Sequence, residues 1–594
     1  MRILLFIVIV FVLLGCGKPV PKVEFEGDTK VGSAVTLMYE GPKVSEVRST
    51  FTDYYLDIIF ISPAGEEITV PGYFAADGDS AHTAASKGKI WKTHFVPHSE
   101  GTWEYNGFFL ERENIVFKWF GPHSPNKPKL TEFKGEFTVE EAQFDPAATD
   151  FREKGMLQDV GARYLQFSGT KDFFLKTGAG SPENILAYAD FDGTYDVGGT
   201  NFPALGDNQL HEFEPHLKDA REGDPTWGDT KGAAILGIAN YYEEVGVNAQ
   251  YLVTMNVEGD GQDVFPWASH DDPYVFDVSK LAQWQRVFEH FNARGVLIDM
   301  LLTETENESW FEAHDGVEVG KDFADSRKLY YREMVARFGH LNGLVFNLGE
   351  ENGVVGNSGQ DPFRQPTSAE QRRAFAKYIR ELDPYGHAVV SHNWPDLEGE
   401  TYGALLGDPD FSGISLQAHD NYFEKIATWT QKSKAAGRQW MVTVDEPLGW
   451  EFGARPDSED PDHEREIKEV LWPTLMAGGA GVNWYFGWQN NAPTSDLSNE
   501  DQRSRHNLWV KSAEVRQWWE ENIPFWEMHA NDEKQLQFRV LSTGGNAAAP
   551  HYKSLKQFRE GGYNNPWPET ITYQINGDDY GKERRLEIDP MNPK

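Results

Sequence analysis

The chain has 594 residues, of which 39% are hydrophobic and 13% aromatic, so it is long enough for two or three domains with large cores. Its formal net charge of −38 argues against nucleic acid and anionic membrane surfaces as partners, because both would repel it. With Cys16 as its single cysteine, the chain forms no internal disulfide and offers no cysteine pair to a metal.

Residues 1–16 have the pattern of a secretory signal peptide. Arg2 supplies the positive start, and an apolar stretch too short to span a bilayer follows from Ile3 to Leu14. Leu13-Leu14-Gly15-Cys16 resembles the bacterial lipobox, which implies a lipidated Cys16 and a place in the bacterial cell envelope. We expect the protein to be anchored in the outer membrane, because no inner-membrane retention signal follows Cys16. The lipid is then its only expected contact with a membrane. An uncleaved anchor is the alternative, and residues 17–22 form a linker.

Residues 23–145 are predicted to form an Ig-like β-sandwich. Short alternating runs such as Ala34 to Tyr39 and Tyr55 to Phe60 are separated by Gly, Pro and Asp turns, and no helical period is present. The region resembles the β-sandwich module in front of bacterial glycosidase barrels, which is often catalogued only as a domain of unknown function. Carbohydrate binding and bracing of the next domain are both open as its role.

Residues 146–534 alternate strands with helices, which is typical of βα units. Eight alternations predict a (β/α)8 TIM barrel, and the absence of Gly-x-Gly-x-x-Gly after the first strand argues against a nucleotide-binding sheet. The eight predicted strands are Ala162 to Phe167, Ala249 to Met255, Val296 to Leu302, Leu344 to Leu348, Ala388 to His392, Gly413 to Gln417, Trp440 to Val444 and Gly481 to Phe486.

Residues 535–594 have little periodic pattern apart from Ile571 to Ile575. A small β appendix is the prediction for this region. An irregular tail is the alternative.

Two of the predicted barrel strands end in paired carboxylates. Glu350 and Glu351 follow the fourth strand, and Asp445 and Glu446 end the seventh. Parallel barrels place their chemistry at the carboxyl ends of the strands, and cleavage of a glycosidic bond needs two facing carboxyl groups. Because side chains alternate along a strand, only one of Asp445 and Glu446 is expected to face the barrel mouth. Solvated loop carboxylates are the alternative.

This arrangement resembles the retaining (β/α)8 glycoside hydrolases of clan A, whose acid/base follows strand four and whose nucleophile ends strand seven. The resemblance implies Glu351 as acid/base and Glu446 as nucleophile. Glu350 stands where the family commonly has an asparagine that contacts the sugar 2-hydroxyl. This departure indicates an altered sugar subsite, or a shift of one residue that would make Glu350 the acid.

Polar and aromatic side chains at other strand ends are candidate substrate contacts. The resemblance implies that a Trp of strand eight floors the sugar site, and a His or Tyr of strand six could orient the nucleophile. Each one alone is equally typical of a core or loop, and the 19 Trp fit either large cores or sugar stacking. The candidates are Glu304, His392, Asn393, Trp394, His419, Tyr422, Trp484 and Trp488.

Neither a metal nor a cofactor is expected. The acidic runs from Asp190 to Asp196 and from Glu258 to Asp263 could bind Ca²⁺, but they lack the twelve-residue loop pattern. The predicted function is a retaining glycosidase with a carbohydrate substrate. Catalytically inactive glycan binding and a metal-dependent barrel hydrolase or lyase are the alternatives. A highly anionic polymer is disfavoured unless Arg364 and Arg455 offset the negative charge.

Overall fold

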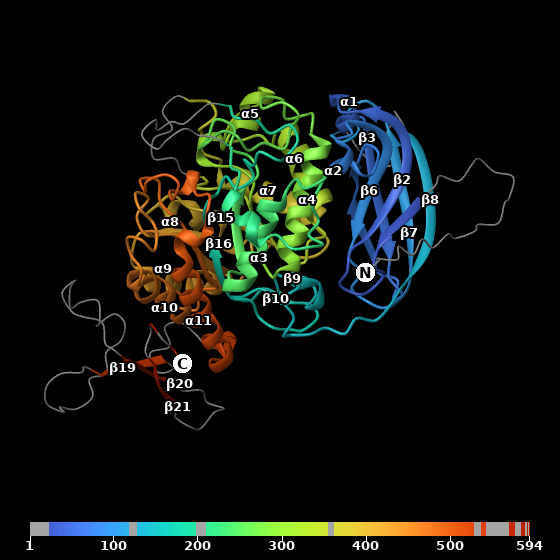
Figure 1. The fold of residues 1–594 in the computed structure, drawn as a ribbon. Coiled ribbons are helices and arrows are strands. Elements are labelled where there is room, and N and C mark those ends of the chain that lie inside the picture. Colours follow the sequence, from blue (N-terminus) through green and yellow to red (C-terminus); the bar gives the residue numbers. More distant parts are fainter. Residues whose placement is uncertain are drawn as a thin grey trace.

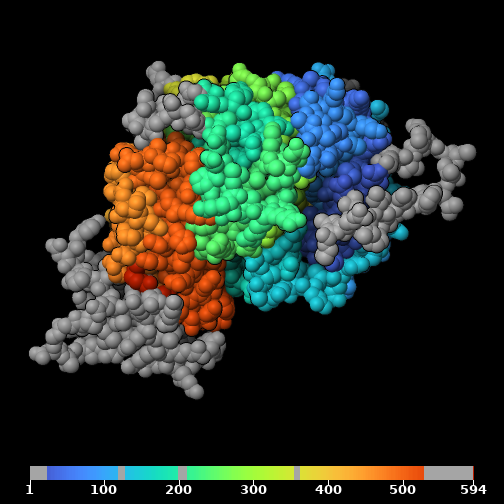
Figure 2. Space-filling view, viewed as in Figure 1, coloured from blue at the N-terminus to red at the C-terminus, as the bar shows by residue number. Residues whose placement is uncertain are grey.

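The computed structural model describes residues 23–117, 128–197, 210–353 and 361–527, and beyond these three further strands with residues 591 and 593. The predicted signal peptide and linker, residues 1–22, lie outside the described residues. An N-terminal β domain flanks one side of a barrel (Figures 1 and 2).

The N-terminal domain is a β-sandwich of two four-stranded antiparallel sheets, with the orders β1-β2-β6-β5 and β4-β3-β7-β8. Alternate residues of each strand point inward, so that Phe60 of one sheet stacks on Phe95 of the other with ring centroids 3.9 Å apart. The predicted sandwich is confirmed. Its strands are β1 (Val23–Gly27), β2 (Val35–Ser45), β3 (Tyr54–Ile61), β4 (Glu67–Pro71), β5 (Tyr73–Phe74), β6 (Lys87–Phe95), β7 (Gly101–Glu111) and β8 (Lys129–Val139), with short helices α1 (Arg48–Thr52) and α2 (Ser80–Thr83) between them.

Eight parallel strands then close into a barrel in chain order, which confirms the predicted (β/α)8 fold. Every residue of these strands is buried, because helices cover the outer face and side chains fill the interior. The strands are β11 (Lys176–Ala179), β12 (Ala249–Val253), β13 (Leu297–Leu301), β14 (Leu344–Asn347), β15 (Ala388–His392), β16 (Gly413–Ala418), β17 (Met441–Pro447) and β18 (Gly481–Trp484).

The prediction for the first barrel strand is wrong. Gln166–Phe167, at the end of the predicted segment, forms β10 and pairs antiparallel with β9 (Leu157–Gln158) outside the barrel. The first barrel strand is instead β11, which pairs with β18 and β12. It has only four residues and starts with Lys176, so no apolar run marks it in the sequence.

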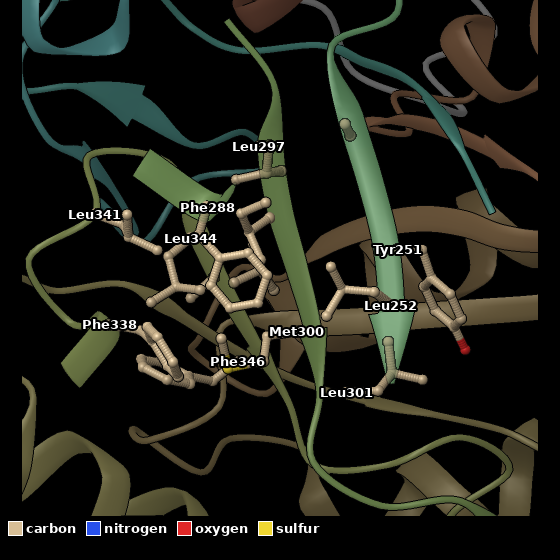
Figure 3. Packing of buried hydrophobic residues seen from close by; sticks show 14 of the residues in the cluster. Tyr251, Leu252, Phe288, Leu297, Met300, Leu301, Phe338, Leu341, Leu344 and Phe346 are labelled. Carbon is tan, nitrogen blue, oxygen red and sulfur yellow. The ribbon is translucent and has the colours of Figure 1, made fainter. Parts of the chain in front are cut away.

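Helices cover the outside of the barrel, and their apolar faces pack on the strands. Phe288 of α4 and Phe338 of α6 lie beside Phe346 of β14, while Tyr251 points from β12 to the side opposite Leu252 (Figure 3). The longer helices are α3 (Ala233–Val245), α4 (Val278–Ala293), α6 (Asp325–Phe338), α7 (Ala369–Leu382), α9 (Tyr422–Ala435) and α11 (His506–Asn522). The shorter ones are α5 (Trp310–Asp315), α8 (Glu398–Tyr402) and α10 (Trp472–Met476), with 3₁₀ turns η1 (Phe151–Glu153), η3 (Glu214–Asp219), η4 (Thr305–Asn307), η5 (Gly403–Leu405), η7 (Asp496–Ser498), η8 (Gln502–Arg505) and η9 (Phe525–Glu527), and a π-helical turn η6 (Glu466–Leu471).

Buried arginines of α6 fasten the sandwich to the barrel. Arg332 donates to the backbone oxygen of Leu56 at 2.8 Å and to the carboxylate of Asp57 at 2.7 Å. Arg337 donates to the backbone oxygen of Phe74 at 3.0 Å. Because these guanidinium groups are almost fully buried, the two domains share one continuous interior at this face.

The last described elements are β19 (Leu536–Leu541), β20 (Thr570–Ile575) and β21 (Arg584–Ile588), which form a three-stranded antiparallel sheet. They match the predicted small β appendix. Among the helices that the structure describes, none combines the length and the apolar character needed to cross a bilayer.

Candidate active site

A β-bulge at the end of β17 brings two neighbouring carboxylates into the barrel. Val444 lies opposite Leu416, but the next pair is Glu446 with Gln417, so Asp445 is an extra residue. Bulges re-aim side chains and are frequent beside active sites. The expected alternation therefore does not hold here. Asp445 contacts Lys176 within the barrel, and Glu446 lies 3.7 Å from His392.

Lys176 and two aspartates form a charged network inside the barrel. The Lys176 ammonium lies 2.6 Å from both Asp299 and Asp445, and Asn483 donates to the same two carboxylates at 3.3 and 3.2 Å. Burial would lower the pKa of Lys176, but the two carboxylates outweigh burial and raise it. This network fixes Asp445, so Glu446 is the carboxylate of the bulge that is not held by a cation.

His392, at the end of β15, links the two strand ends that carry the candidate catalytic residues. Its Nδ1 accepts a hydrogen bond of 3.0 Å from the backbone N–H of Glu351, so in the neutral ring Nε2 carries the proton. Burial lowers the pKa of His392 to about 4, which keeps the ring neutral near pH 7. The Nε2–H group therefore lies beside the Glu446 carboxylate, 3.7 Å away.

Glu350 and Glu351 lie in a tight turn after β14. The backbone N–H of Glu350 donates to the Thr303 oxygen at 3.0 Å, and that of Asn352 donates to the His392 oxygen at 2.9 Å. Glu351 has φ +46°, a strained region for a residue with a Cβ, and such strain is typical of functional sites. Gly349 is required because a Cβ there would lie 2.3 Å from Thr303 Oγ1.

Both Glu350 and Glu351 are close to Glu446. Burial is the main cause that raises the pKa of Glu446, and the charge on Glu351 raises it further, while hydrogen bonds with Gln417 and Glu350 lower it. Burial also raises the pKa of Glu350, followed by the charge on Glu446. Gln417 hydrogen bonds to Glu351 as well. The ends of the fourth, sixth and seventh strands therefore meet at one point.

These residues belong to a larger buried group, here called the mouth carboxylates, in which burial raises every pKa. In Glu183, Glu304 and Glu350 the charges of neighbouring carboxylates add to this effect. The oxygens of these three lie within 4.8 Å of one another, so they could share protons or hold a cation. The mouth carboxylates are Glu183, Asp260, Glu304, Glu306, Glu350, Glu351, Glu446 and Asp496.

Several members of the site have no signal in the sequence. Tyr251 is buried on β12 with a hydroxyl that has no hydrogen-bond partner, and the charges of Glu350 and Glu446 raise its pKa after burial. Burial, followed by the charges of Asp496 and Glu446, likewise raises the pKa of Tyr485, just after β18. Glu183 was missed because the first strand was misplaced, and Asp496 lies in a loop without any motif.

Three of the candidate substrate contacts are engaged in structural hydrogen bonds. The Asn393 side chain bonds to the backbone of Gln417 and to the Tyr402 hydroxyl. The Tyr422 hydroxyl donates to the Ala418 oxygen and accepts from the Leu448 N–H group. Trp484 is fully buried, and its indole N–H donates 3.0 Å to Ser512 of α11, so its ring packs toward the covering helix.

Other candidates remain partly exposed at the ends of their strands, namely Trp394, His419 and Trp488. The backbone N–H of Trp488 donates to the backbone oxygen of Trp450. This hydrogen bond joins the loops after β17 and β18. Trp450 and Phe452 in the first of these loops are 45% and 40% exposed. Large exposed aromatic rings beside an active-site strand are suited to stacking on an apolar sugar face.

The comparisons with known proteins agree with this architecture. Residues 33–109 match the family described as "Domain of unknown function (DUF5060)". No curated protein matches the chain. A solved structure of a putative glycoside hydrolase from Bacteroides vulgatus is similar over 96% of this chain and 98% of its own, with 11% identity and a TM-score of 0.52.

Two further solved structures are less similar. A glycoside hydrolase family 5 protein from Bacteroides vulgatus matches 74% of this chain and 89% of its own, with 13% identity and a TM-score of 0.40. An endo-β-1,4-mannanase from Thermotoga petrophila matches 60% of this chain and 93% of its own, with 11% identity and a TM-score of 0.33. The first of the three neighbours supports the two-domain fold and, at 11% identity, nothing beyond the fold.

Proposed function

We propose that this protein is a retaining glycoside hydrolase, with Glu446 as nucleophile and Glu351 as acid/base. The observation that carries the proposal is that Glu446, at the end of the seventh strand of a closed barrel, and Glu351, in the turn after the fourth, interact within one buried site. Glu351 would protonate the leaving oxygen while Glu446 attacks the anomeric carbon. Glu351 would then deprotonate the water that releases the sugar.

The surroundings of the two carboxyl groups support this division of roles. A nucleophile must be ionised and an acid must be protonated, so the two environments have to differ. Burial and the charge on Glu351 raise the pKa of Glu446, whereas its hydrogen bonds with Gln417 and Glu350 act in the opposite direction and favour the ionised form. For Glu351, burial raises the pKa and the charges on Glu350 and Glu306 raise it further, which favours the protonated form.

We propose a neutral oligosaccharide or polysaccharide as the substrate. The mouth carboxylates would repel an anionic sugar. Arg364 and Arg455, the two residues that could offset this negative charge, already have carboxylate partners. Arg364 lies 3.6 Å from Glu306, and Arg455 lies 3.1 Å from Glu459. Trp450 and Phe452 would provide stacking surfaces for further sugar units.

A panel of neutral polysaccharides tests the proposal. Purified wild type should hydrolyse at least one of them, while Glu446→Gln and Glu351→Gln should each lose about a hundredfold or more. Glu381→Gln, a matched change of an exposed carboxylate on α7, should keep full activity. If both site variants stay active, the assignment is wrong. If wild type binds glycans without hydrolysis, the protein is a glycan-binding relative of the same fold.

A metal-dependent barrel hydrolase or lyase is the second candidate, favoured by the convergence of Glu183, Glu304 and Glu350. Carboxylate oxygens at this spacing suit a hard divalent cation. This candidate predicts that EDTA abolishes activity and that restoration by Mg²⁺, Ca²⁺ or Mn²⁺ is lost in Glu304→Gln. Full activity of the chelated enzyme supports the metal-free mechanism instead.

A further inference from the structure

The loop after β17 and the first residue of η6 contain a second cluster of potential metal ligands, which shares no residue with the mouth carboxylates. Asp460, His463 and Glu466 each offer one atom, and these three atoms lie within 4.8 Å of one another. His463 is 0% and Glu466 is 3% exposed. Their spacing in the chain, Asp-x-x-His-x-x-Glu, brings the side chains together as the loop enters the π-helical turn η6. Single π-helical turns are frequent at functional sites.

Two buried atoms of this cluster face each other without a hydrogen-bond partner. His463 Nδ1 and Glu466 Oε2 are both unpartnered, and they lie 3.9 Å apart. No Lys or Arg of the described residues forms an ion pair with Asp460 or Glu466. Leaving such buried polar atoms unpartnered is costly, so both atoms are available to bind one shared cation.

Asp457 selects the tautomer of the neutral His463 ring. Its Oδ1 lies 2.8 Å from His463 Nε2, while its Oδ2 accepts from the Asn507 N–H group at 3.0 Å. In the neutral ring Nε2–H then donates to Asp457, and the lone pair of Nδ1 points to the cluster. A histidine that ligates a metal usually donates its other N–H to a carboxylate in this way.

The separation of 3.9 Å is too long for a hydrogen bond but suits two ligands of one ion. An N–H···O bond spans about 2.7–3.2 Å. Zinc lies about 2.0–2.2 Å from imidazole nitrogen and carboxylate oxygen, so two ligands of a tetrahedral ion are roughly 3.3–3.5 Å apart, and a side-chain shift of about 0.5 Å would bring His463 and Glu466 to that spacing. One imidazole with two carboxylates suits zinc better than calcium or magnesium, which prefer oxygen ligands.

We propose that Asp460, His463 and Glu466 bind one Zn²⁺ ion, with Asp457 orienting His463. The ion would hold the loop after β17 in place. Asp457 carries this constraint to the start of α11, because its backbone N–H donates to Ser504 and its carboxylate accepts from Asn507. The same loop contains Trp450 and Phe452, so the ion would also fix the exposed aromatic residues. Zinc binding does not depend on the proposed glycosidase activity.

Calorimetric titration of the full chain with ZnCl₂, after EDTA treatment and removal of the chelator, tests this proposal. Wild type should bind about one equivalent, and zinc should raise the thermal midpoint because it binds the folded state. His463→Gln and Glu466→Gln should each weaken binding about tenfold or more, and Asp457→Asn should weaken it through the orientation of His463. Glu464→Gln, an exposed neighbour on the same segment, is the matched control and should bind as wild type does.

Three results would overturn the proposal. The first is no saturable zinc binding by wild type. The second is unchanged binding in folded His463→Gln and Glu466→Gln proteins, with folding checked by circular dichroism. The third is saturable binding of Ca²⁺ or Mg²⁺ but not of Zn²⁺. Glu446→Gln should bind zinc as wild type does, so that failure of the proposed catalysis and failure of the zinc site give separate results.

Discussion

The charge on Glu350 is, after burial, the largest influence that raises the pKa of Glu351. Glu350 stands where the resembled family commonly has a neutral asparagine. The change Glu350→Asn removes that charge, so the pKa of Glu351 should fall and the basic limb of the pH–activity profile should move to lower pH. The measurement is kcat/KM against pH for wild type and variant on one substrate. A basic limb that does not move would show that Glu350 does not act on the acid/base.

The mouth carboxylates should also make stability depend on pH. Burial, followed by the charges on Asp260 and Glu350, raises the pKa of Glu304 above its value in the unfolded chain. A carboxyl group of this kind stabilises the fold fully below its unfolded pKa, and the contribution is lost as the pH rises through the folded pKa. Acid should therefore favour this part of the fold, in contrast to a carboxylate held in an ion pair.

We expect Glu304→Gln to stabilise the protein, by about 1–3 kcal/mol at pH 8 and by less at pH 5. The amide keeps the shape and can place its NH₂ group where Oε1 now has no hydrogen-bond partner. Thermal unfolding at both pH values measures the effect, with Glu381→Gln as the exposed control. Equal destabilisation at both pH values would contradict a charge-based penalty.

At the scale of single elements, the first barrel strand depends on a buried ion pair. Lys176 on β11 lies 2.6 Å from carboxylates of β13 and β17, so it joins three strands inside the barrel. Lys176→Met leaves Asp299 and Asp445 buried without their cation, and we expect a loss of about 3–5 kcal/mol in the free energy of unfolding. Chemical denaturation measures it. Lys377→Met, at an exposed position of α7, is the control, and an equally small effect of both changes would contradict this role.

This strand also shows why sequence patterns found seven barrel strands and missed one. The other strands are apolar runs, because both of their faces are buried. β11 is Lys-Thr-Gly-Ala, and its lysine is tolerated only because Asp299 and Asp445, more than 100 residues away in the chain, neutralise it. A compensation between distant residues leaves no local signal. The bulge at Asp445 was missed for the same reason, since it appears only in the pairing with β16.

At the scale of the whole molecule, the sequence predicted the two strand ends that carry carboxylates. It did not predict the residues that other segments bring to the same site. Glu351 and Glu446 could be predicted as candidates because each lies at the end of a recognisable buried strand. Tyr251, Glu183 and Asp496 could not, since they converge only when the barrel closes. The predicted role of a strand-eight Trp as floor of the sugar site does not fit Trp484. Its indole N–H donates to Ser512 of the covering helix α11. Sequence alone does not show whether an aromatic ring at a strand end points into the barrel or toward a covering helix.

The proposed location of the whole molecule depends on Cys16, which lies outside the described residues. We propose lipid anchoring in the bacterial cell envelope. Cys16→Ser should release the protein from the membrane fraction or block its processing, because no other anchor is proposed. Fractionation with immunodetection measures this, and an otherwise identical Ser33→Ala protein should stay with the membranes. Unchanged membrane association of Cys16→Ser would rule out the lipid anchor.

The central claim is that Glu446 forms the covalent bond and that Glu351 is the acid/base. Sodium azide with the two alanine variants, followed by NMR assignment of the glycosyl azide, tests it most directly. In Glu351→Ala, azide should attack the glycosyl-enzyme and give a product of retained configuration. In Glu446→Ala, azide should attack the substrate itself and give the inverted product. The reverse pattern, or a retained product from Glu350→Ala in place of Glu351→Ala, would contradict the assignment.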